Sequence, residues 1–200
     1  MRTHRLRTFG SFVFLIVAVC ITLGLPVQAQ GGNGTIERVS VSSTGAEGFG
    51  NSYEPAITPD GRYVAFESDA SNLVSGDTND SDDIFVHDRQ TGQTTRVSVT
   101  SSGVQGNSDS NSPAISYDGR YVAFQSMAGN FATADTNGTW DVFVHDRQTG
   151  QTTCVSVSPT GEVGTNYTFD PRLSGDGRYV VFYSYASNLV AGDTNGKSDV

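Results

Sequence analysis

Residues 59–68 read Pro-Asp-Gly-Arg-Tyr-Val-Ala-Phe-Glu-Ser, and much of this segment recurs along the chain. Its central Asp-Gly-Arg-Tyr-Val, at 60–64, returns unchanged at 118–122 and at 176–180, each time 58 residues further on. The same offset relates Asp-Ile-Phe-Val-His-Asp-Arg-Gln-Thr-Gly, at 83–92, to a nearly identical run in the next copy. A fixed period of this length indicates a repeat architecture in which each copy is one structural unit.

Turn residues divide each unit into four short strands, which in the first copy are expected at about 54–58, 62–68, 83–89 and 93–99. An Asp-Gly turn joins the first two strands, and a Gln-Thr-Gly-Gln turn joins the last two. Pro55, Pro113 and Pro171 are expected to open the first strand of each unit, where a missing N–H is tolerated. The second and third strands are apolar on both faces, as in sheets that lie between other sheets. The sequence therefore predicts an all-β fold, a β-propeller of four-stranded antiparallel blades.

The repeat spans the chain from residue 35 to residue 200, with units at about 38–95, 96–153 and 154–200, or about 2.9 repeats. Propellers usually close with about four to eight blades, so the sequence predicts an incomplete propeller, the front part of a longer protein. Residues 36–41 match the fourth strand of the later units. We expect them to form such a strand and to complete a last blade.

The repeat resembles the WD-like propeller repeat of TolB-type proteins, through the run at 59–68 followed by Asp-Ile-Phe-Val at 83–86 and a short turn. Similar blades also occur in the propeller domains of prolyl-oligopeptidase-like and tricorn-like peptidases. The resemblance therefore implies the fold more than the function. The connection at 69–82 is longer than is typical of the TolB-type repeat, so the partners of TolB are not carried over.

The first 29 residues have the features of a secretory signal peptide. Arg2, Arg5 and Arg7 precede an apolar run at 12–25, and Val-Gln-Ala at 27–29 offers small residues for cleavage after Ala29. The apolar run is shorter than the roughly 20 residues that span a bilayer, although an uncleaved anchor is an alternative. Residues 30–34 would then form a short linker, and the protein would be secreted or periplasmic, with no membrane span after cleavage.

The charge and the cysteines exclude several classes of protein. The formal charge is −9, and removing residues 1–29 leaves 9 basic against 21 acidic groups, a net charge of −12. Nucleic acid and anionic membrane surfaces are therefore poor partners. Cys20 lies in the signal peptide and leaves Cys154 as one thiol, which cannot form an internal disulfide.

An Asp-x-Asn motif with a second Asp six residues after the first recurs in the long connection between the second and third strands of each unit. Its members are Asp77, Asn79 and Asp83, then Asp135, Asn137 and Asp141, then Asp193, Asn195 and Asp199. Their oxygens suit a hard cation, so calcium is the one cofactor that the sequence indicates. In the other interpretation, which the sequence favours, each Asn forms an Asx turn and the last Asp begins a strand. Lys197, inside the third copy, argues against a cation there.

Residues that repeat in every copy indicate a role in the scaffold. His87 and His145 occupy the same position in adjacent sheets, about 10 Å apart, which is too far for one zinc ion. The recurrent arginines, such as Arg62 and Arg89, are expected to bond turn carbonyls and acidic side chains.

Aromatic residues that break the repeat are candidates for ligand contacts, because a ligand touches each blade differently. They are Trp140, Tyr53, Phe169, Phe49 and Tyr167, all in or beside the long connections, where they replace small or polar residues of the other copies. Such rings stack on sugars or hold a peptide. The alternative is that they form small clusters that cover the loops. Phe131 aligns with Leu73 and Leu189 and is assigned to packing.

The sequence contains no motif of a known catalytic site, and its acids and histidines recur as copies rather than as one asymmetric constellation. We therefore expect no enzyme, but a binding module that presents an acidic long-loop face to a protein, peptide or glycan of the cell envelope or extracellular space. The alternative is the N-terminal propeller of a prolyl-oligopeptidase-like or other hydrolase whose catalytic domain lies beyond residue 200.

Overall fold

The computed structural model describes residues 36–133 and 135–200. The expected signal peptide at 1–29 and linker at 30–34 lie outside the described residues. Glu37–Val200 forms one compact unit, which contains every strand named below. Within the described ranges there is no helix of the length and apolar character that crossing a membrane requires.

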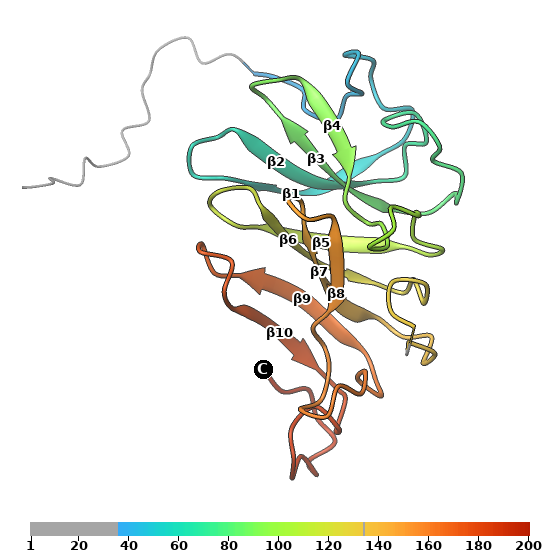
Figure 1. The fold of residues 1–200 in the computed structure, drawn as a ribbon, viewed down its shortest axis with the longest axis vertical. Helices are drawn as coiled ribbons and strands as arrows, with labels where there is room; N and C mark the ends of the chain where they lie inside the picture. Colours follow the sequence, from blue (N-terminus) through green and yellow to red (C-terminus); the bar gives the residue numbers. More distant parts are fainter. Residues whose placement is uncertain (1–35, 134) are drawn as a thin grey trace, which may run out of the picture. The chain divides into compact units, whose positions relative to one another are not determined.

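The strands form two four-stranded antiparallel sheets and one two-stranded sheet, stacked one after another (Figure 1). Strands that follow one another in the chain pair with each other, so each sheet is a meander. The predicted all-β class and the four-stranded antiparallel blade are confirmed. Blade 1 contains β1 (Ser52–Ile57), β2 (Tyr63–Ser68), β3 (Asp83–Asp88) and β4 (Gln93–Arg96); blade 2 contains β5 (Ser110–Ile115), β6 (Tyr121–Ser126), β7 (Asp141–Asp146) and β8 (Gln151–Cys154); blade 3 contains β9 (Thr168–Leu173) and β10 (Val180–Ser184).

The Asp-Gly turn closes the first hairpin of each blade, as predicted. In blade 1, Gly61 has a φ of 71°, a value that glycine adopts without a steric penalty. The Asp60 carboxylate accepts a hydrogen bond from Thr58 Oγ1 (2.6 Å) and another from the backbone N–H of Arg62 (3.0 Å). These two bonds fix the turn, and they recur at the second and third copies.

The prolines do not open the first strand, and that expectation was wrong. Pro55 lies inside β1, where the pairing with β2 is interrupted between Tyr53 and Ala56. The residue before each proline has a positive φ, which marks a β-bulge repeated in all three blades, at Glu54 (47°), Ser112 (54°) and Asp170 (49°). The missing N–H of proline costs no ladder bond there, because β1 is the edge strand of its sheet.

The fourth strand of blades 1 and 2 is shorter than predicted. It ends at Arg96 in blade 1, because the Ser98 hydroxyl accepts the N–H of Ile84 (3.1 Å) where the backbone ladder would otherwise continue. Residues 36–41 do not form the expected strand. Their one β-bridge is isolated and joins Val41 to Glu47. Among the described residues no strand pairs with this segment.

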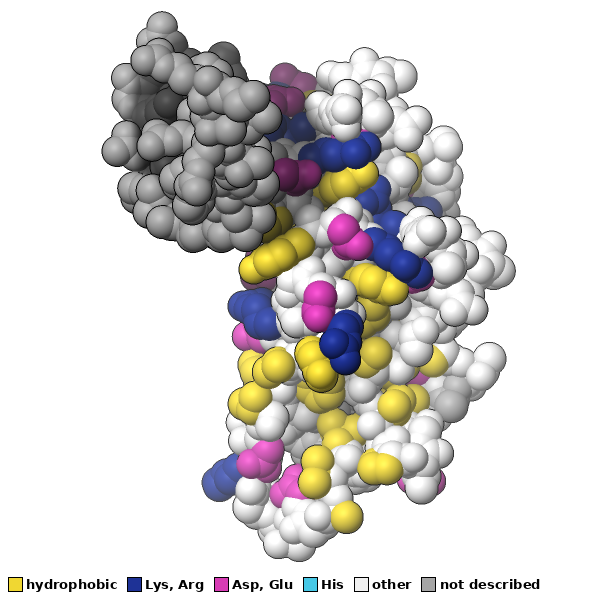
Figure 2. All heavy atoms as spheres, turned by 60° about the vertical axis from the view of Figure 1, so that its left-hand side comes forward, with side chains coloured by type: hydrophobic (Ala, Val, Ile, Leu, Met, Phe, Trp, Pro, Cys, Tyr) yellow, Lys and Arg dark blue, Asp and Glu magenta, His cyan; other side chains and the backbone are white. Residues whose placement is uncertain are grey.

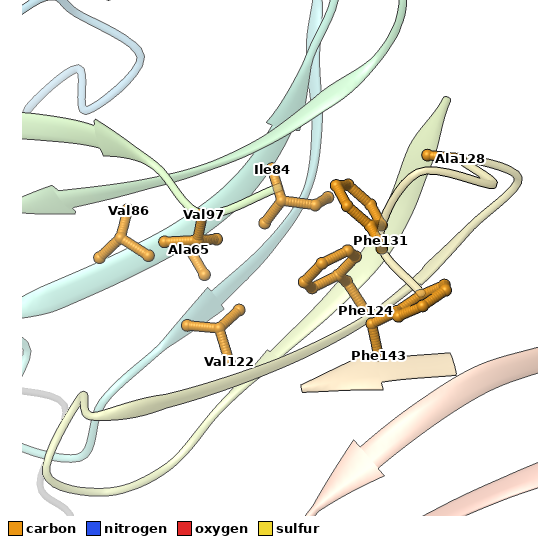
Figure 3. Packing of buried hydrophobic residues seen from close by; sticks show 9 residues of the cluster. All are labelled: Ala65, Ile84, Val86, Val97, Val122, Phe124, Ala128, Phe131 and Phe143. Atoms are coloured by element: carbon orange, nitrogen blue, oxygen red, sulfur yellow. The ribbon is translucent and has the colours of Figure 1, made fainter. Parts of the chain in front are cut away.

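The hydrophobic core lies between blades 1 and 2 (Figure 3). Blade 1 contributes aliphatic side chains of β2, β3 and the segment after β4, and blade 2 contributes three phenylalanine rings, Val122 and Ala128 from β6, β7 and the loop between them. Phe124 and Phe143 are fully buried and stack with their ring centroids 6.0 Å apart. Phe131 packs edge-on against both rings, so its assignment to packing is confirmed.

The recurrent arginines bond acids and turn carbonyls, as predicted. Arg62 makes a bidentate contact with Asp88 (3.1 and 2.8 Å), and Arg120 repeats it with Asp146. Hydrogen bonds from these guanidinium groups lower the pKa of both carboxyls. Figure 2 shows the tight-turn side of the molecule, where basic and acidic side chains alternate with hydrophobic ones.

The two histidines are scaffold residues in this structure. His87 and His145 are 4% and 6% exposed, and each Nδ1 lies 2.9 Å from a threonine hydroxyl of its own blade. Burial lowers the pKa of both imidazoles, so each histidine favours its neutral form.

A tyrosine from blade 1 and one from blade 2 each lie against the turn glycine of the next blade. The Tyr63 ring lies against Gly119, and the Arg147 guanidinium covers that ring at 4.6 Å while Nη1 donates to the Gly119 carbonyl (2.6 Å). Tyr121 repeats the contact at Gly177. Because a Cβ at Gly119 would overlap the Tyr63 ring, this position can hold only glycine unless that ring is displaced from its contact with the next blade.

We expect Gly119→Ala to lower the free energy of unfolding by about 1–3 kcal/mol more than Gly92→Ala does. Gly92 is the matched control, since it has nearly the same φ (74° against 72°) but no atom within 4 Å of the added methyl group. The strain of a positive φ is thus common to both variants, and only the overlap differs. Urea unfolding measures both values, and equal losses would show that the Tyr63 contact does not hold the blades together.

Candidate functional site

Both long connections of each blade emerge at one end of the strands. The meander places the loop between β2 and β3 beside the loop between β4 and β5, opposite the tight turns, as Figure 1 shows. We call this region, made of residues 42–51 and 69–82 and their copies, the long-loop end. Long loops held by a rigid sheet are a frequent location of binding sites.

One asparagine in each blade joins the two long loops to each other. In blade 1, Asn72 donates its Nδ2 to the Glu47 carbonyl (2.7 Å) and accepts the N–H of Phe49 at Oδ1 (2.8 Å). Asn130 and Asn188 repeat these contacts at the later copies. The long-loop end is therefore a hydrogen-bonded surface with the same frame in each blade.

The asparagine of each Asp-x-Asn motif forms an Asx turn. Its Oδ1 accepts the backbone N–H two residues later, at 3.4 Å in Asn79, 2.7 Å in Asn137 and 2.6 Å in Asn195. Its Nδ2 donates to the last aspartate of the motif, at 3.3, 2.8 and 3.1 Å in the same order. These contacts agree with the interpretation that each asparagine forms an Asx turn. The asparagine Oδ1 atoms accept backbone hydrogen bonds within the turn.

The two aspartates of the first motif hold an arginine between them. Arg96 Nη1 lies 3.1 Å from Asp77 Oδ1 and 3.0 Å from Asp83 Oδ2, and the three side chains are 9%, 5% and 0% exposed. Burial raises the pKa of both carboxyls, and the guanidinium opposes that rise. Of the nine residues proposed to bind calcium, Asp77 and Asp83 thus face a cation that the chain itself supplies.

The second and third motifs have no such arginine. Blade 2 carries Cys154 at the position of Arg96, while Asp135 and Asp141 remain buried. In the third motif, Asn195 and Asp199 are exposed, and Asp193 is half-buried. Within residues 36–133 and 135–200, no group of three or more His, Cys, Asp or Glu side chains is arranged to hold a metal ion.

The aromatic candidates differ in exposure. Phe49, Tyr53 and Tyr167 are 87%, 53% and 45% exposed, whereas Trp140 and Phe169 are half-buried. The structure brings two of the five together, since Tyr167 and Phe169 stack with centroids 5.7 Å apart and an interplanar angle of 11°.

Two further tyrosines, which the sequence reasoning missed, complete an aromatic cluster in blade 3. Tyr183 pairs with Phe169 across the two strands, with ring centroids 5.5 Å apart, and Tyr185 pairs its N–H with the Tyr167 carbonyl (2.9 Å). Tyr185 is 46% exposed. We call Tyr167, Phe169, Tyr183 and Tyr185 the aromatic cluster.

The signal for Tyr183 and Tyr185 was present in the sequence. Both positions break the repeat, because Tyr183 stands where blades 1 and 2 have Glu67 and Gln125, and Tyr185 stands where they have Asp69 and Met127. The strand pairing was needed to place them beside Tyr167 and Phe169.

A hollow of about 470 Å³ crosses the first strands of the three blades, β1, β5 and β9. Small and aliphatic side chains such as Ala56, Ala114 and Leu173 line it, and Asp170 and Arg172 give it both signs of charge. Asp170 lines the hollow, and its negative charge acts with burial to raise the pKa of Tyr183 in the aromatic cluster. The two features therefore adjoin.

No family model and no curated protein matches the chain. Solved structures with a similar fold include a TolB described as putative from Agrobacterium tumefaciens, with 22% identity and a TM-score of 0.45 over 72% of this chain and 41% of that one. TolB from Acinetobacter baumannii has 19% identity and a TM-score of 0.39 over 74% of this chain and 31% of that one.

A third similar structure is the β-propeller domain of the Trilobed protease from Pyrococcus furiosus, which has an open velcro topology. Its identity is 14% and its TM-score 0.45, over 68% of this chain and 35% of that one. The chain thus spans less than half the length of each of these three structures. At these identities the similarity concerns the blade architecture alone.

Proposed function

We propose that this chain is part of a secreted or periplasmic β-propeller binding module that takes a protein, peptide or glycan at its long-loop end. The aromatic cluster of blade 3 is the main contact in this proposal. The main support for this proposal is a difference between the blades. Blade 2 has polar residues or methionine at four positions where blade 3 has aromatic residues.

The chemistry of the cluster favours a ligand with flat or apolar faces and polar edges. Stacked tyrosine and phenylalanine rings offer a broad apolar contact, and the tyrosine hydroxyls offer hydrogen bonds at its rim. Asp170 adds a negative charge to the wall of the hollow, and this charge acts on Tyr183 of the cluster. A sugar ring or a peptide with an apolar side chain beside a basic group fits this combination.

Replacing Tyr185 by methionine tests the proposal, because blade 2 already has Met127 at that position and tolerates it. We expect Tyr185→Met to weaken binding about tenfold or more, as truncation of an aromatic contact typically does. The ligand is first selected by presenting the purified chain to arrays of glycans and peptides, and its affinity is then measured by calorimetry.

Tyr179→Ala is the control, since Tyr179 is 62% exposed in the same blade but follows the tight turn at the other end of the strands. It should leave the affinity unchanged. The proposal fails if no glycan or peptide binds the chain, or if Tyr185→Met binds as well as the unmodified chain.

A further inference from the structure

Blades 1 and 2 each bury a pair of aspartates at equivalent positions, but the side chain beside the pair differs between them. In blade 1 the Arg96 guanidinium bridges Asp77 and Asp83, and its Nη2 also donates to the Gly76 carbonyl (3.3 Å). A positive charge is thus built into the centre of that loop. In blade 2 the residue in register is Cys154, whose side chain is much shorter and does not reach across the loop as a cation.

The corresponding aspartates of blade 2 are buried without a positive partner. Asp135 is 6% exposed and Asp141 is fully buried, and no ion pair of the described residues includes either of them. Asp141 accepts hydrogen bonds from Ser156 Oγ (2.7 Å) and Asn137 Nδ2 (2.8 Å). Burying carboxylates in this way is costly unless a cation or a proton compensates them.

Two oxygens of this loop have no hydrogen-bond partner. Asp135 Oδ2 and Thr139 Oγ1 are both buried and both unpaired, although nearly all buried polar atoms in proteins are paired. Asp135 and Asp141 stand in register with Asp77 and Asp83, the two carboxylates that Arg96 Nη1 bridges in blade 1. Burial, with a smaller contribution from the charge of Asp135, raises the pKa of Asp141.

Cys154 stands at the position of Arg96 but supplies no positive charge, and its Sγ lies 3.5 Å from Ser156 Oγ. Burial, with smaller contributions from Asp141 and Asp135, raises the pKa of its thiol to about 11. A hard cation prefers oxygen ligands to sulfur, so the thiol is not assigned as a ligand.

We propose that blade 2 binds a hard divalent cation, calcium, between Asp135 and Asp141, at the place where blade 1 holds the guanidinium of Arg96. The donors that the loop offers are oxygens, from two carboxylates and the Thr139 hydroxyl. Calcium accepts such oxygens together with backbone carbonyls and water in a flexible geometry, whereas magnesium demands a regular octahedron. This inference is independent of the ligand proposed for the aromatic cluster.

The substitution Cys154→Arg tests the proposal, because it places in blade 2 the guanidinium group that Arg96 supplies in blade 1. Calcium at about 100 times its Kd should raise the Tm of the unmodified chain by roughly 5 °C or more relative to a sample in EDTA. In Cys154→Arg the calcium shift should vanish. Cys154→Ser should retain the shift, because the thiol is not a ligand in this proposal.

Terbium, which replaces calcium in oxygen sites, gives a second readout that does not depend on stability. Trp140 is the one tryptophan of the chain and directly precedes Asp141, so its excitation should sensitise the luminescence of a bound terbium ion. One ion per chain is expected, calcium should displace it, and Asp135→Asn should abolish the signal.

The proposal is overturned if the unmodified chain shows neither the Tm shift nor sensitised terbium, or if Cys154→Arg keeps both. Asp77→Asn, in blade 1, is the matched control for Asp135→Asn. It removes the equivalent aspartate beside Arg96 and should leave the terbium signal intact, so loss of the signal in that variant would also contradict the assignment to blade 2.

Discussion

Arg96→Ala is expected to lower the free energy of unfolding by about 3–5 kcal/mol, the usual cost of removing one partner from a buried ion pair. The substitution leaves Asp77 and Asp83 buried, with side chains 5% and 0% exposed, and removes the positive charge that faces both. Ser98 Oγ (2.5 Å) and Asn79 Nδ2 (3.3 Å) still donate to Asp83, but two neutral donors do not compensate two carboxylates.

The loss should be smaller at about pH 5 than at pH 7, because burial already raises the pKa of both carboxyls and the variant lets them take up protons. Urea unfolding at the two pH values measures the difference. Glu37→Gln is the control, since it breaks the ion pair of Arg89 at side chains 39% and 46% exposed, and such pairs contribute at most about 1 kcal/mol. Equal losses in the two variants would show that Arg96 is no more than a surface residue.

The fold was predictable because the sequence contains three copies of one structural unit, the last of them partial. The Asp-Gly turn, the apolar runs of the second and third strands and the 58-residue offset all point to the same four-stranded meander, which the structure confirms. Pro55 could not be placed from sequence, because a proline that opens a strand and one that sits in a bulge of an edge strand have the same local pattern.

The candidate site was predictable only in part. Tyr167 and Phe169 were found because they break the repeat, while Tyr183 and Tyr185 break it equally and become meaningful only through the pairing of β9 with β10. Arg96 reaches Asp77 across the blade from β4, and no sequence spacing reveals that contact. The exchange of Arg96 for Cys154 is visible in the alignment of the copies, but its consequence depends on the burial of Asp135 and Asp141.

The same exchange predicts a pH dependence that belongs to Asp141. Burial raises its pKa to about 6, from an ordinary value of 3.8. The folded protein therefore binds this proton more tightly than the unfolded chain does, and the free energy of unfolding falls as the pH rises from about 4 to about 6. Ionisation of the buried Asp141 carboxyl lowers the free energy of unfolding by about 3 kcal/mol in total. This loss is complete above that pH range and absent below it.

Asp141→Asn should remove this slope when unfolding is measured by urea from pH 4 to pH 7.5 in EDTA. Other groups also titrate in this window, with His87 and His145 acting in the opposite direction because burial lowers their pKa. They are the same in both proteins and cancel in the difference between the two curves. Cys154→Arg should flatten the slope in the same way, since a guanidinium beside Asp141 favours the ionised carboxylate. Parallel curves for all three proteins would mean that Asp141 titrates alike in the folded and unfolded chains, and that its burial in blade 2 carries no uncompensated charge.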